Sequence, residues 1–388
     1  MATLLLFLIC IIYIGLGLPD SSLGSSWPAI YLDLNLPISY QSFITIIISV
    51  FTTLSCFFSA RLINKFGTGI VTAISTLLSA VGLILFSVSN SMVLLCLSGI
   101  PLGFGAGGID SALNNYVALR YKPWQMNILH CFYGIGVTSS PIIVSLMLVR
   151  GGWRNAFFVL FLLLFILSLL AFFMLPLWKK IQNVEKGEMV EPITLSFKQM
   201  LKLSSVRYAF IAFFATCALE FTCGTWGATY LVNTALFSPE KSALIVSLYY
   251  VGMTVSRGLS SLLSTKLKTE RIVFIGYSLV VAGIVLFFLP LAPITKGVAL
   301  LLVGLGNGQT FPNLTLLTPS AFGKAYSQSM VSAEMLFANL GILIMPPLFG
   351  VLAEHLSTDI LPIFVGVLCA FMVVFTILFF NKSKTQKF

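Results

Sequence analysis

Carboxylates stand inside the long apolar segments of this chain, and they constrain its fold more than any other feature. Twelve apolar runs follow one another along the 388 residues, and acids interrupt several of them, at Asp20, Asp110, Glu220 and Glu334. A run of about 20 apolar residues is long enough to cross a bilayer as a helix. A charge is costly at that depth, so a purely structural helix normally leaves it out. The pattern predicts a multi-pass membrane protein with a polar pathway through its centre.

The composition indicates that lipid is the main solvent of this chain. Hydrophobic residues make up 58% of it and charged residues only 9%, whereas an ordinary soluble domain is roughly 25% charged. The first apolar run is too long for a cleaved signal peptide, and we expect it to form helix 1. The seven cysteines fall inside the predicted helices without metal-ligand spacing, so we interpret them as packing residues.

The lysines and arginines between the apolar runs predict the topology. Most of them lie on the cytoplasmic side if both termini are cytoplasmic, as the positive-inside rule requires. We therefore expect an even number of crossings in the cell membrane, and we attribute the net charge of +10 to this orientation and not to nucleic-acid binding. The predicted helices are 2–32, 40–62, 69–88, 92–119, 124–149, 154–177, 206–234, 242–264, 271–290, 297–319, 326–352 and 360–380.

One long polar segment divides these helices into two sets of six. Residues 179–204 carry Lys, Glu, Gln and Pro and are predicted to form a cytoplasmic linker. It joins an N-terminal six-helix bundle, residues 1–178, to a C-terminal six-helix bundle, residues 205–381. A basic cytoplasmic tail, residues 382–388, follows.

The two halves contain the same short patterns in the same order. Each half has a Trp-x-Ala-x-Tyr segment, then a Gly-x-Gly-x-Gly series, then Phe, Gly and Pro at matching spacing. The matched segments are 27–31 with 226–230, 103–107 with 304–308, and 132–141 with 337–346. Parallel six-helix repeats build one large class of secondary transporters, whose substrate site lies between the halves near mid-membrane. The glycines at 103, 105 and 108 also fit a dinucleotide-binding pattern, but inside a membrane helix they indicate close helix packing.

Several motifs resemble those of a known transporter family. The two-fold repeat, the Gly-Trp-Arg sequence at 152–154 and the basic loop after helix 2 resemble the major facilitator superfamily. The Asp-Ser-Ala-Leu-Asn sequence at 110–114 resembles the Glu-Thr-Ala-Ala-Asn motif of its fucose permease-like sugar/proton symporters. Segments 129–141 and 304–312 also resemble that branch. The resemblance implies an all-α integral membrane fold with 12 transmembrane helices in two six-helix bundles. It further implies that Asp110 and the helix 1 acid, Asp20, take part in transport.

Two acids of the first half are candidates for binding substrate and a coupling ion. Asp110 and Asn114 are one helical turn apart, so they face one side of their helix and together suit a hydroxyl-rich ligand. The alternative is a protonated Asp110 that only bonds to a neighbouring helix. Asp20 follows Pro19, where we expect a Gly- and Ser-rich break in helix 1, and shares a stripe with Trp27. An aromatic ring beside a carboxylate suits a sugar, although Trp27 also fits an interfacial position.

The second half adds charged residues at similar depth. Glu220 is a candidate for ion coupling, together with Asp20, Asp110 and Glu334. Arg257 is expected to form a structural ion pair with Glu334 or, alternatively, with Glu220. Four acids against one arginine leave uncompensated negative charge at low dielectric, so some of these acids must be protonated or bind a cation. The expected coupling ion is H⁺ or Na⁺, and no metal site or other cofactor is predicted.

A further set of polar and aromatic side chains is expected to line the cavity. Each member has an alternative role as an interhelical contact, worth only about 1 kcal/mol. The set consists of Trp226, His130, Asn307, Gln309, Asn313 and Asn339.

These observations favour a cation-coupled symporter of a sugar or similar small hydroxylated solute, which acts as a monomer in the bilayer by alternating access. A proton/drug antiporter of the same fold is the alternative. A membrane-embedded enzyme or a non-transporting receptor is a third reading, but no HExxH, GxSxG or phosphate-loop motif occurs in the chain. We therefore expect a transporter and not an enzyme.

Overall fold

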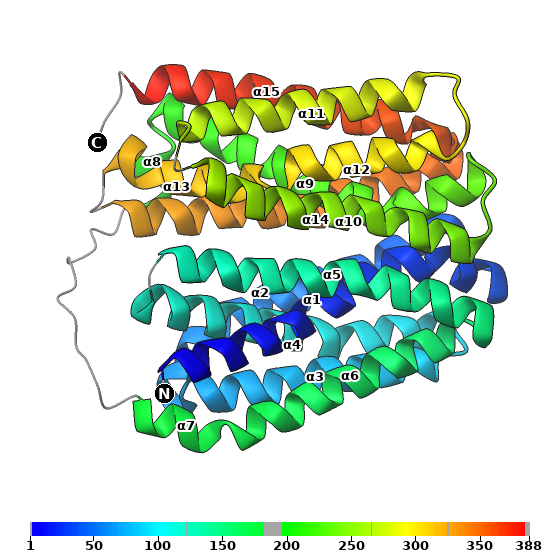
Figure 1. The fold of residues 1–388 in the computed structure, drawn as a ribbon, viewed down its shortest axis with the longest axis horizontal. Coiled ribbons are helices and arrows are strands. Elements are labelled where there is room, and N and C mark those ends of the chain that lie inside the picture. Colours follow the sequence, from blue (N-terminus) through cyan, green and yellow to red (C-terminus); the bar gives the residue numbers. More distant parts are fainter. Residues whose placement is uncertain (1, 122, 182–195, 265, 324–325, 385–388) are drawn as a thin grey trace.

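Two bundles of long helices make up the fold (Figure 1). The computed structural model describes all residues except 1, 122, 182–195, 265, 324–325 and 385–388. The two bundles lie side by side with their helices running in the same general direction, and the start of α1 and the end of α15 lie at the same end of the molecule (Figure 1). Most of the predicted linker, residues 179–204, and of the predicted tail, residues 382–388, lies outside the described residues.

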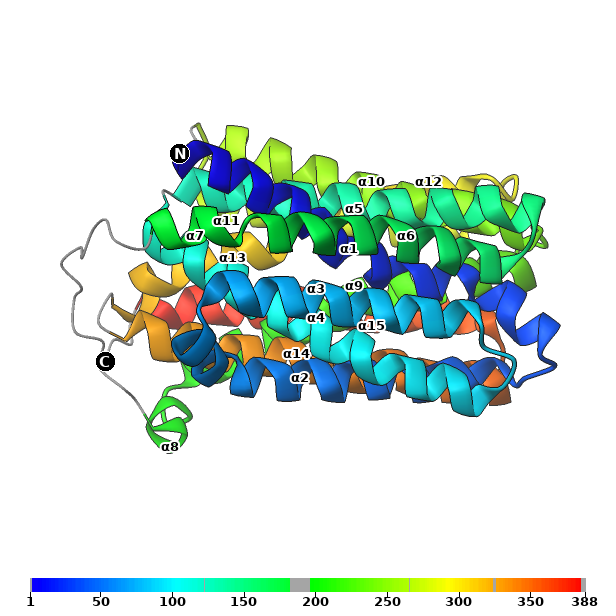
Figure 2. The same ribbon diagram turned by 90° about the horizontal axis from the view of Figure 1, so that it is seen from below.

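The first bundle is formed by the helices that precede the linker. They are α1 (Ala2–Asp33), α2 (Gln41–Phe66), α3 (Thr68–Ser87), α4 (Met92–Arg120), α5 (Pro123–Arg150), α6 (Trp153–Phe173) and the short α7 (Leu175–Ile181). A 3₁₀ turn, η1 (Ile38–Tyr40), connects α1 to α2. Figure 2 shows α3, α4 and α6 packed beside α1 and α5.

The second bundle follows the linker. The short α8 (Phe197–Met200) lies near the end of the predicted linker, and the bundle contains α9 (Ser204–Asn233), α10 (Pro239–Leu263), α11 (Thr269–Phe288), α12 (Thr295–Asn307), α13 (Thr310–Phe322), α14 (Ser327–His355) and α15 (Leu361–Ser383). A 3₁₀ turn, η2 (Thr358–Ile360), precedes α15.

The helices account for twelve membrane crossings. Ten of them in the described part of the chain are long and apolar enough to cross a bilayer, namely α1 to α6, α9, α11, α14 and α15. The helix α10 is more polar, and α12 and α13 have 13 residues each and cross as a pair. The predicted arrangement of 12 transmembrane helices in two six-helix bundles is therefore confirmed.

Two expectations about helix continuity were wrong. The helix predicted over 297–319 is interrupted at Gly308 and Gln309. Pro312 has no N–H and cannot bond to the Gly308 carbonyl one turn earlier, which weakens the helix at this point. Conversely, α1 runs without a break through Pro19. Proline is tolerated there because neighbouring helices pack closely against α1 and support its backbone.

Within each bundle, the repeated glycines allow the same pairs of helices to pack closely. A side chain at Gly136 on α5 would collide with the Ile14 carbonyl on α1, and one at Gly341 on α14 would collide with the Phe214 carbonyl on α9. The glycine series behaves in the same way, because Gly103 faces α2 and its counterpart Gly304 faces α10. The interpretation of these glycines as close helix contacts is confirmed.

This packing predicts that Gly136→Ala destabilises the protein. The added methyl group meets a backbone carbonyl that cannot move aside, so we expect a loss of roughly 1–3 kcal/mol. Gly258→Ala on α10 is the matched control, because nothing lies within 4 Å of its added carbon atom. Thermal unfolding of the purified variants measures both effects. Equal melting temperatures for the two variants would contradict the argument.

Hydrogen bonds join the two bundles at the end opposite the termini. The Tyr31 hydroxyl donates to Asn233 at 3.0 Å, and the Gln41 side-chain amide donates to the Thr225 carbonyl at 3.3 Å. Close by, the Ser39 backbone amide donates to Glu354 at 3.1 Å, and the Ser42 hydroxyl donates to the Pro347 carbonyl at 3.4 Å. In these four bonds residues 31–42 of the first bundle supply the donors and the second bundle supplies the acceptors. We call residues 31–42 the closing segment.

Candidate functional site

A cleft lies between the two bundles, closer to the middle of the molecule than the closing segment is. It encloses about 300 Å³ of empty space, part of which is open to solvent. Helices α1 and α5 line it from the first bundle, and α9 and α10 line it from the second. Its lining residues are Asp20, Tyr133, Val137, Glu220, Phe221, Gly224, Thr225, Tyr250 and Met253. The cleft is thus a shared site that neither bundle forms alone.

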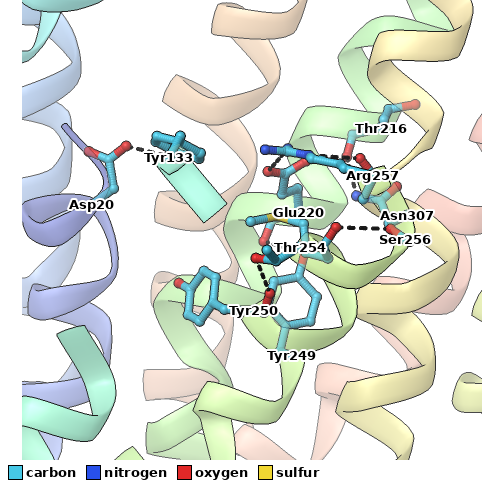
Figure 3. A network of polar contacts seen from close by, with 12 residues as sticks. Asp20, Tyr133, Thr216, Glu220, Tyr249, Tyr250, Thr254, Ser256, Arg257 and Asn307 are labelled. Atoms are coloured by element: carbon cyan, nitrogen blue, oxygen red, sulfur yellow. Dashed lines mark hydrogen bonds and ion pairs between the residues drawn. The ribbon is translucent and has the colours of Figure 1, made fainter. Parts of the chain in front are cut away.

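Asp20 contributes the carboxylate on the first-bundle side. Its side chain is exposed to the cleft, and the Tyr133 hydroxyl donates to its Oδ2 atom at 2.8 Å (Figure 3). A hydroxyl donor leaves the negative charge of an ionised carboxylate uncompensated. The structure thus places Asp20 at the cleft, and its predicted role in coupling stays a prediction.

Glu220 contributes the carboxylate on the opposite side, and it is paired. Its Oε1 atom lies 3.3 Å from Nη2 of Arg257, and the two side chains are only 11% and 13% exposed. The Nε atom of Arg257 also donates to the Gly308 carbonyl at 2.9 Å. This carbonyl receives no helical hydrogen bond from Pro312, and Arg257 supplies a donor in its place. Arg257 thus links Glu220 to the interruption between α12 and α13 (Figure 3).

The pairing of Arg257 with Glu334 was wrong, and the alternative with Glu220 is correct. Glu334 on α14 accepts both of its hydrogen bonds from the Thr318 hydroxyl of α13, at 2.8 and 3.0 Å. Its side chain is 1% exposed. It lies eight residues into α14, whereas the salt bridge of Arg257 is with Glu220.

A second polar cluster lies within the first bundle. The Tyr13 hydroxyl donates to Oδ1 of Asp110 at 2.7 Å, and the Asn114 amide donates to the same oxygen at 2.7 Å and to Tyr13 at 2.8 Å. The predicted pairing of Asp110 with Asn114 on one face of α4 is confirmed. His130 lies beside this cluster, with its ring edge-on to Tyr13 at 5.8 Å between centroids. The Tyr133 ring lies 6.2 Å from the Tyr13 ring, so the cluster adjoins the cleft.

The structure does not bring the two predicted tryptophans into the cleft. Trp27 is 0% exposed and donates its indole N–H to the Ile38 carbonyl of η1 at 2.9 Å. Trp226 is 1% exposed and donates to the Pro346 carbonyl of α14 at 2.7 Å. Both rings sit in the large apolar core. Their equivalent positions agree with the sequence repeat, and in this conformation they hold helices together.

The predicted amides of α12 and α13 brace the helix interruption. Gln309 donates to the Ile272 carbonyl of α11 at 2.8 Å, and Asn313 donates to Ser260 of α10 at 2.7 Å. Asn307 is fully buried and donates to the Thr216 carbonyl of α9 at 3.3 Å. Gln309, Asn313 and Asn307 thus form contacts between helices, which is the alternative role that the sequence analysis gave them. Asn339 on α14 is exposed and is not among the residues that line the cleft.

The sequence analysis did not identify the tyrosines of the site. Tyr13, Tyr133 and Tyr250 contact or adjoin the predicted acids, yet none of them was a candidate. A signal was present: Tyr13 precedes Asp20 by two helical turns, and Tyr250 precedes Arg257 by the same interval. Within the described residues, no group of three or more His, Cys, Asp or Glu side chains is placed to hold a metal ion.

Comparison with known proteins identifies the family. A family model described as Major Facilitator Superfamily matches residues 5–333, which is most of the chain. The protein is a member of the major facilitator superfamily. This membership confirms the resemblance that the repeat and the motifs indicated. The family and the fold are those of transporters and not of enzymes.

Individual relatives are distant and differ in their described roles. The chain is 24% identical over 93% of its length to Bypass of stop codon protein 6 of Saccharomyces cerevisiae, covering 79% of that protein. It is 21% identical over 70% of its length to the Glucose/mannose transporter GlcP of Bacillus subtilis, covering 68% of that protein.

Solved structures share the fold across nearly the whole chain. The nucleoside transporter NupG superposes with a TM-score of 0.73 at 14% identity, covering 97% of this chain and 98% of that one. A D-xylose-proton symporter superposes with a TM-score of 0.73 at 13% identity, covering 99% of both chains. At these identities the likeness establishes the major facilitator fold alone.

Proposed function

We propose that this protein is a secondary active transporter that couples inward movement of a proton, or alternatively sodium, to symport of a sugar or similar small hydroxylated solute. The observation that carries the proposal is the cleft between the bundles, where Asp20 from one half faces Glu220 from the other. A site shared by two bundles can open to either side when one bundle rocks against the other. The described roles of a glucose/mannose transporter and a D-xylose-proton symporter support the proposed solute and coupling.

The lining of the cleft suits a sugar. Tyr133 and Tyr250 present aromatic surface on which the apolar face of a sugar ring can stack. Asp20, Glu220 and Thr225 add polar groups around this surface that can accept or donate hydrogen bonds to hydroxyl groups. We assign solute binding to these residues. The roles predicted for His130, Asn114 and the amides of α12 and α13 remain secondary, because the contacts described above for these side chains are with protein groups.

The carboxyl groups divide into two kinds, and the division supports cation coupling. Glu220 is neutralised by Arg257. Asp20, Asp110 and Glu334 instead accept hydrogen bonds from uncharged hydroxyl or amide groups. A lone negative charge is expensive in the membrane interior, so such groups hold a proton or a cation for part of the transport cycle. We assign coupling first to Asp20, because it alone of the three lines the cleft.

The distribution of lysines and arginines supports a cytoplasmic position for both termini, in the cell membrane. With this orientation the closing segment lies on the outer side, and the described conformation is closed to the outside. Release of the hydrogen bonds between residues 31–42 and the second bundle would then open the cleft outward. We propose that the monomer carries out the whole cycle, because each monomer contains both bundles.

Uptake into proteoliposomes tests this function. Purified protein would be given a panel of labelled hexoses, pentoses and deoxyhexoses under an inward proton gradient, an inward sodium gradient or no gradient. Accumulation of one sugar above its external concentration under one of the gradients is the expected result, and it also identifies the cation. No accumulation of any sugar by folded protein under either gradient would overturn the proposal and favour the antiporter alternative, which proton-driven movement of apolar cations would test.

A further inference from the structure

Tyr133 touches charged groups of both bundles. It belongs to α5 of the first bundle, and its hydroxyl donates to Asp20 on α1 of the same bundle at 2.8 Å. Its ring faces the guanidinium of Arg257 on α10 of the second bundle, 5.7 Å from the ring centroid. Figure 3 shows the phenol between the acid and the arginine. We propose that Tyr133 couples the proton on Asp20 to the Arg257–Glu220 pair across the two bundles; this inference rests on the proposed function.

The hydrogen bond to Asp20 depends on the charge of the acid. An ionised carboxylate accepts a much stronger hydrogen bond than a neutral acid does. When a hydronium ion from the open side gives its proton to Asp20, an O–H bond forms on the carboxyl group and water is left. The bond from Tyr133 then weakens. Because the phenol oxygen and the ring form one rigid plane, a shift of the hydroxyl tilts the ring that faces Arg257.

Arg257 is placed to respond to that tilt. Its cation is attracted to the electron-rich face of the Tyr133 ring. The same side chain bonds Glu220 on α9 and the Gly308 carbonyl at the interruption between α12 and α13. A loss of the ring contact therefore changes the balance between these bonds at the point where the second bundle is interrupted. The Thr138 and Thr254 hydroxyls, 3.2 Å apart, lie beside this contact and join α5 to α10.

Other charged and titratable groups surround Asp20, and they fit this assignment. The helices packed against α1 contribute an arginine, two further acids and three tyrosines near the cleft. These groups are Tyr133 on α5, Glu220 on α9, Tyr249, Tyr250 and Arg257 on α10, and Asp110 on α4. Of these, Tyr133 contacts both Asp20 and Arg257. Its ring therefore provides a direct chain of contacts from Asp20 to Arg257.

Tyr133→Phe separates this coupling role from simple packing. The variant keeps the ring under Arg257 and removes the donor to Asp20. Two rates would be measured in the same proteoliposomes: exchange of the transported sugar at equilibrium, and accumulation of that sugar under the proton gradient. The expected result is a fall of about tenfold in the ratio of accumulation to exchange, because a hydrogen bond to a charged group is lost. Tyr277→Phe makes the same chemical change at a buried tyrosine of α11 that does not line the cleft and whose hydroxyl lies 2.7 Å from that of Thr376, and it should leave the ratio unchanged.

Equal loss of both rates in Tyr133→Phe, or a ratio that matches wild type, would overturn the proposal. A second measurement needs no sugar at all. Hydrogen–deuterium exchange of residues 31–42 would be compared between variants at one acidic and one alkaline pH. If the signal from Asp20 reaches the contacts between the bundles, exchange of these residues should change with pH in wild type but not in Asp20→Asn. Tyr133→Phe should then lack this pH response.

The two measurements keep this inference separate from the proposed function. If no sugar accumulates but Tyr133→Phe abolishes the pH response of residues 31–42, the substrate proposal fails and the coupling role stands. If the sugar accumulates in wild type but the pH response persists in Tyr133→Phe, the symporter proposal stands and the coupling role is overturned. A wild-type protein without a pH response would also overturn it.

Discussion

Asp20→Asn is expected to abolish gradient-driven accumulation of the solute while the protein still exchanges solute across the membrane. Asparagine has almost the same shape, and its side-chain oxygen can accept the bond that Tyr133 now donates to Asp20. It cannot take up or release a proton, so the solute should equilibrate and no longer accumulate. Proteoliposome uptake with and without the gradient measures the change. The expected loss is the entire coupled component, a larger effect than removal of any single hydrogen bond.

Asp33→Asn is the matched control for this prediction. It makes the same chemical change on the same helix, but Asp33 is the last residue of α1, where it pairs with Arg154 at 2.7 Å. It should retain accumulation, with some loss of stability from the weakened pair. If Asp20→Asn accumulates solute as well as wild type, then Asp20 is not the coupling acid. Asp110→Asn and Glu334→Gln would then be the next variants to test.

The fold was predictable because its signals are local and repeated. Each apolar run is long enough to span the bilayer, and the matched glycines at 136 and 341 mark equivalent helix contacts in the two halves. Internal symmetry of this kind can be read without any knowledge of three-dimensional contacts. The interruption at Gly308 was harder to predict. Pro312 weakens its helix, but Pro19 does not interrupt α1, and the difference depends on neighbouring groups that the sequence does not place.

The site was predictable only in part, for a similar reason. Buried acids are rare in membrane helices, so Asp20, Asp110 and Glu220 could be selected from the sequence alone. Their partners could not be selected, because a tyrosine in an apolar helix is usually a packing residue and becomes functional only through the helix that faces it. Tyr133 acquires its role from α1 on one side and α10 on the other.

The partner of Arg257 shows the same limit for charged residues. Glu220 and Glu334 are both acids of the second half, and their positions along the sequence allowed either pairing. The packing of α9 beside α10 decides in favour of Glu220, whereas Glu334 lies against Thr318 of α13. Charge and depth can be estimated from a sequence, but which helix faces which must come from the structure.

Arg257→Ala should destabilise the protein more than any other single substitution in the site. It leaves Glu220 as an unpaired buried charge and removes the donor from the Gly308 carbonyl. Removal of one partner of a buried ion pair typically costs about 3–5 kcal/mol. Thermal unfolding of the purified protein measures the loss. The variant should also lose transport, because the interruption between α12 and α13 is no longer held by the α10 side chain.

Two companion variants separate the charge of Arg257 from its geometry. Arg257→Lys keeps the positive charge, but a single ammonium group cannot reproduce the planar fork that reaches Glu220 and Gly308 together. It should therefore recover only part of the stability. In Arg257→Ala combined with Glu220→Gln, no buried charge is left unpaired, so most of the loss should disappear. If the double variant is as unstable as Arg257→Ala alone, the bond to Gly308, and not the ion pair, is the main contribution of Arg257.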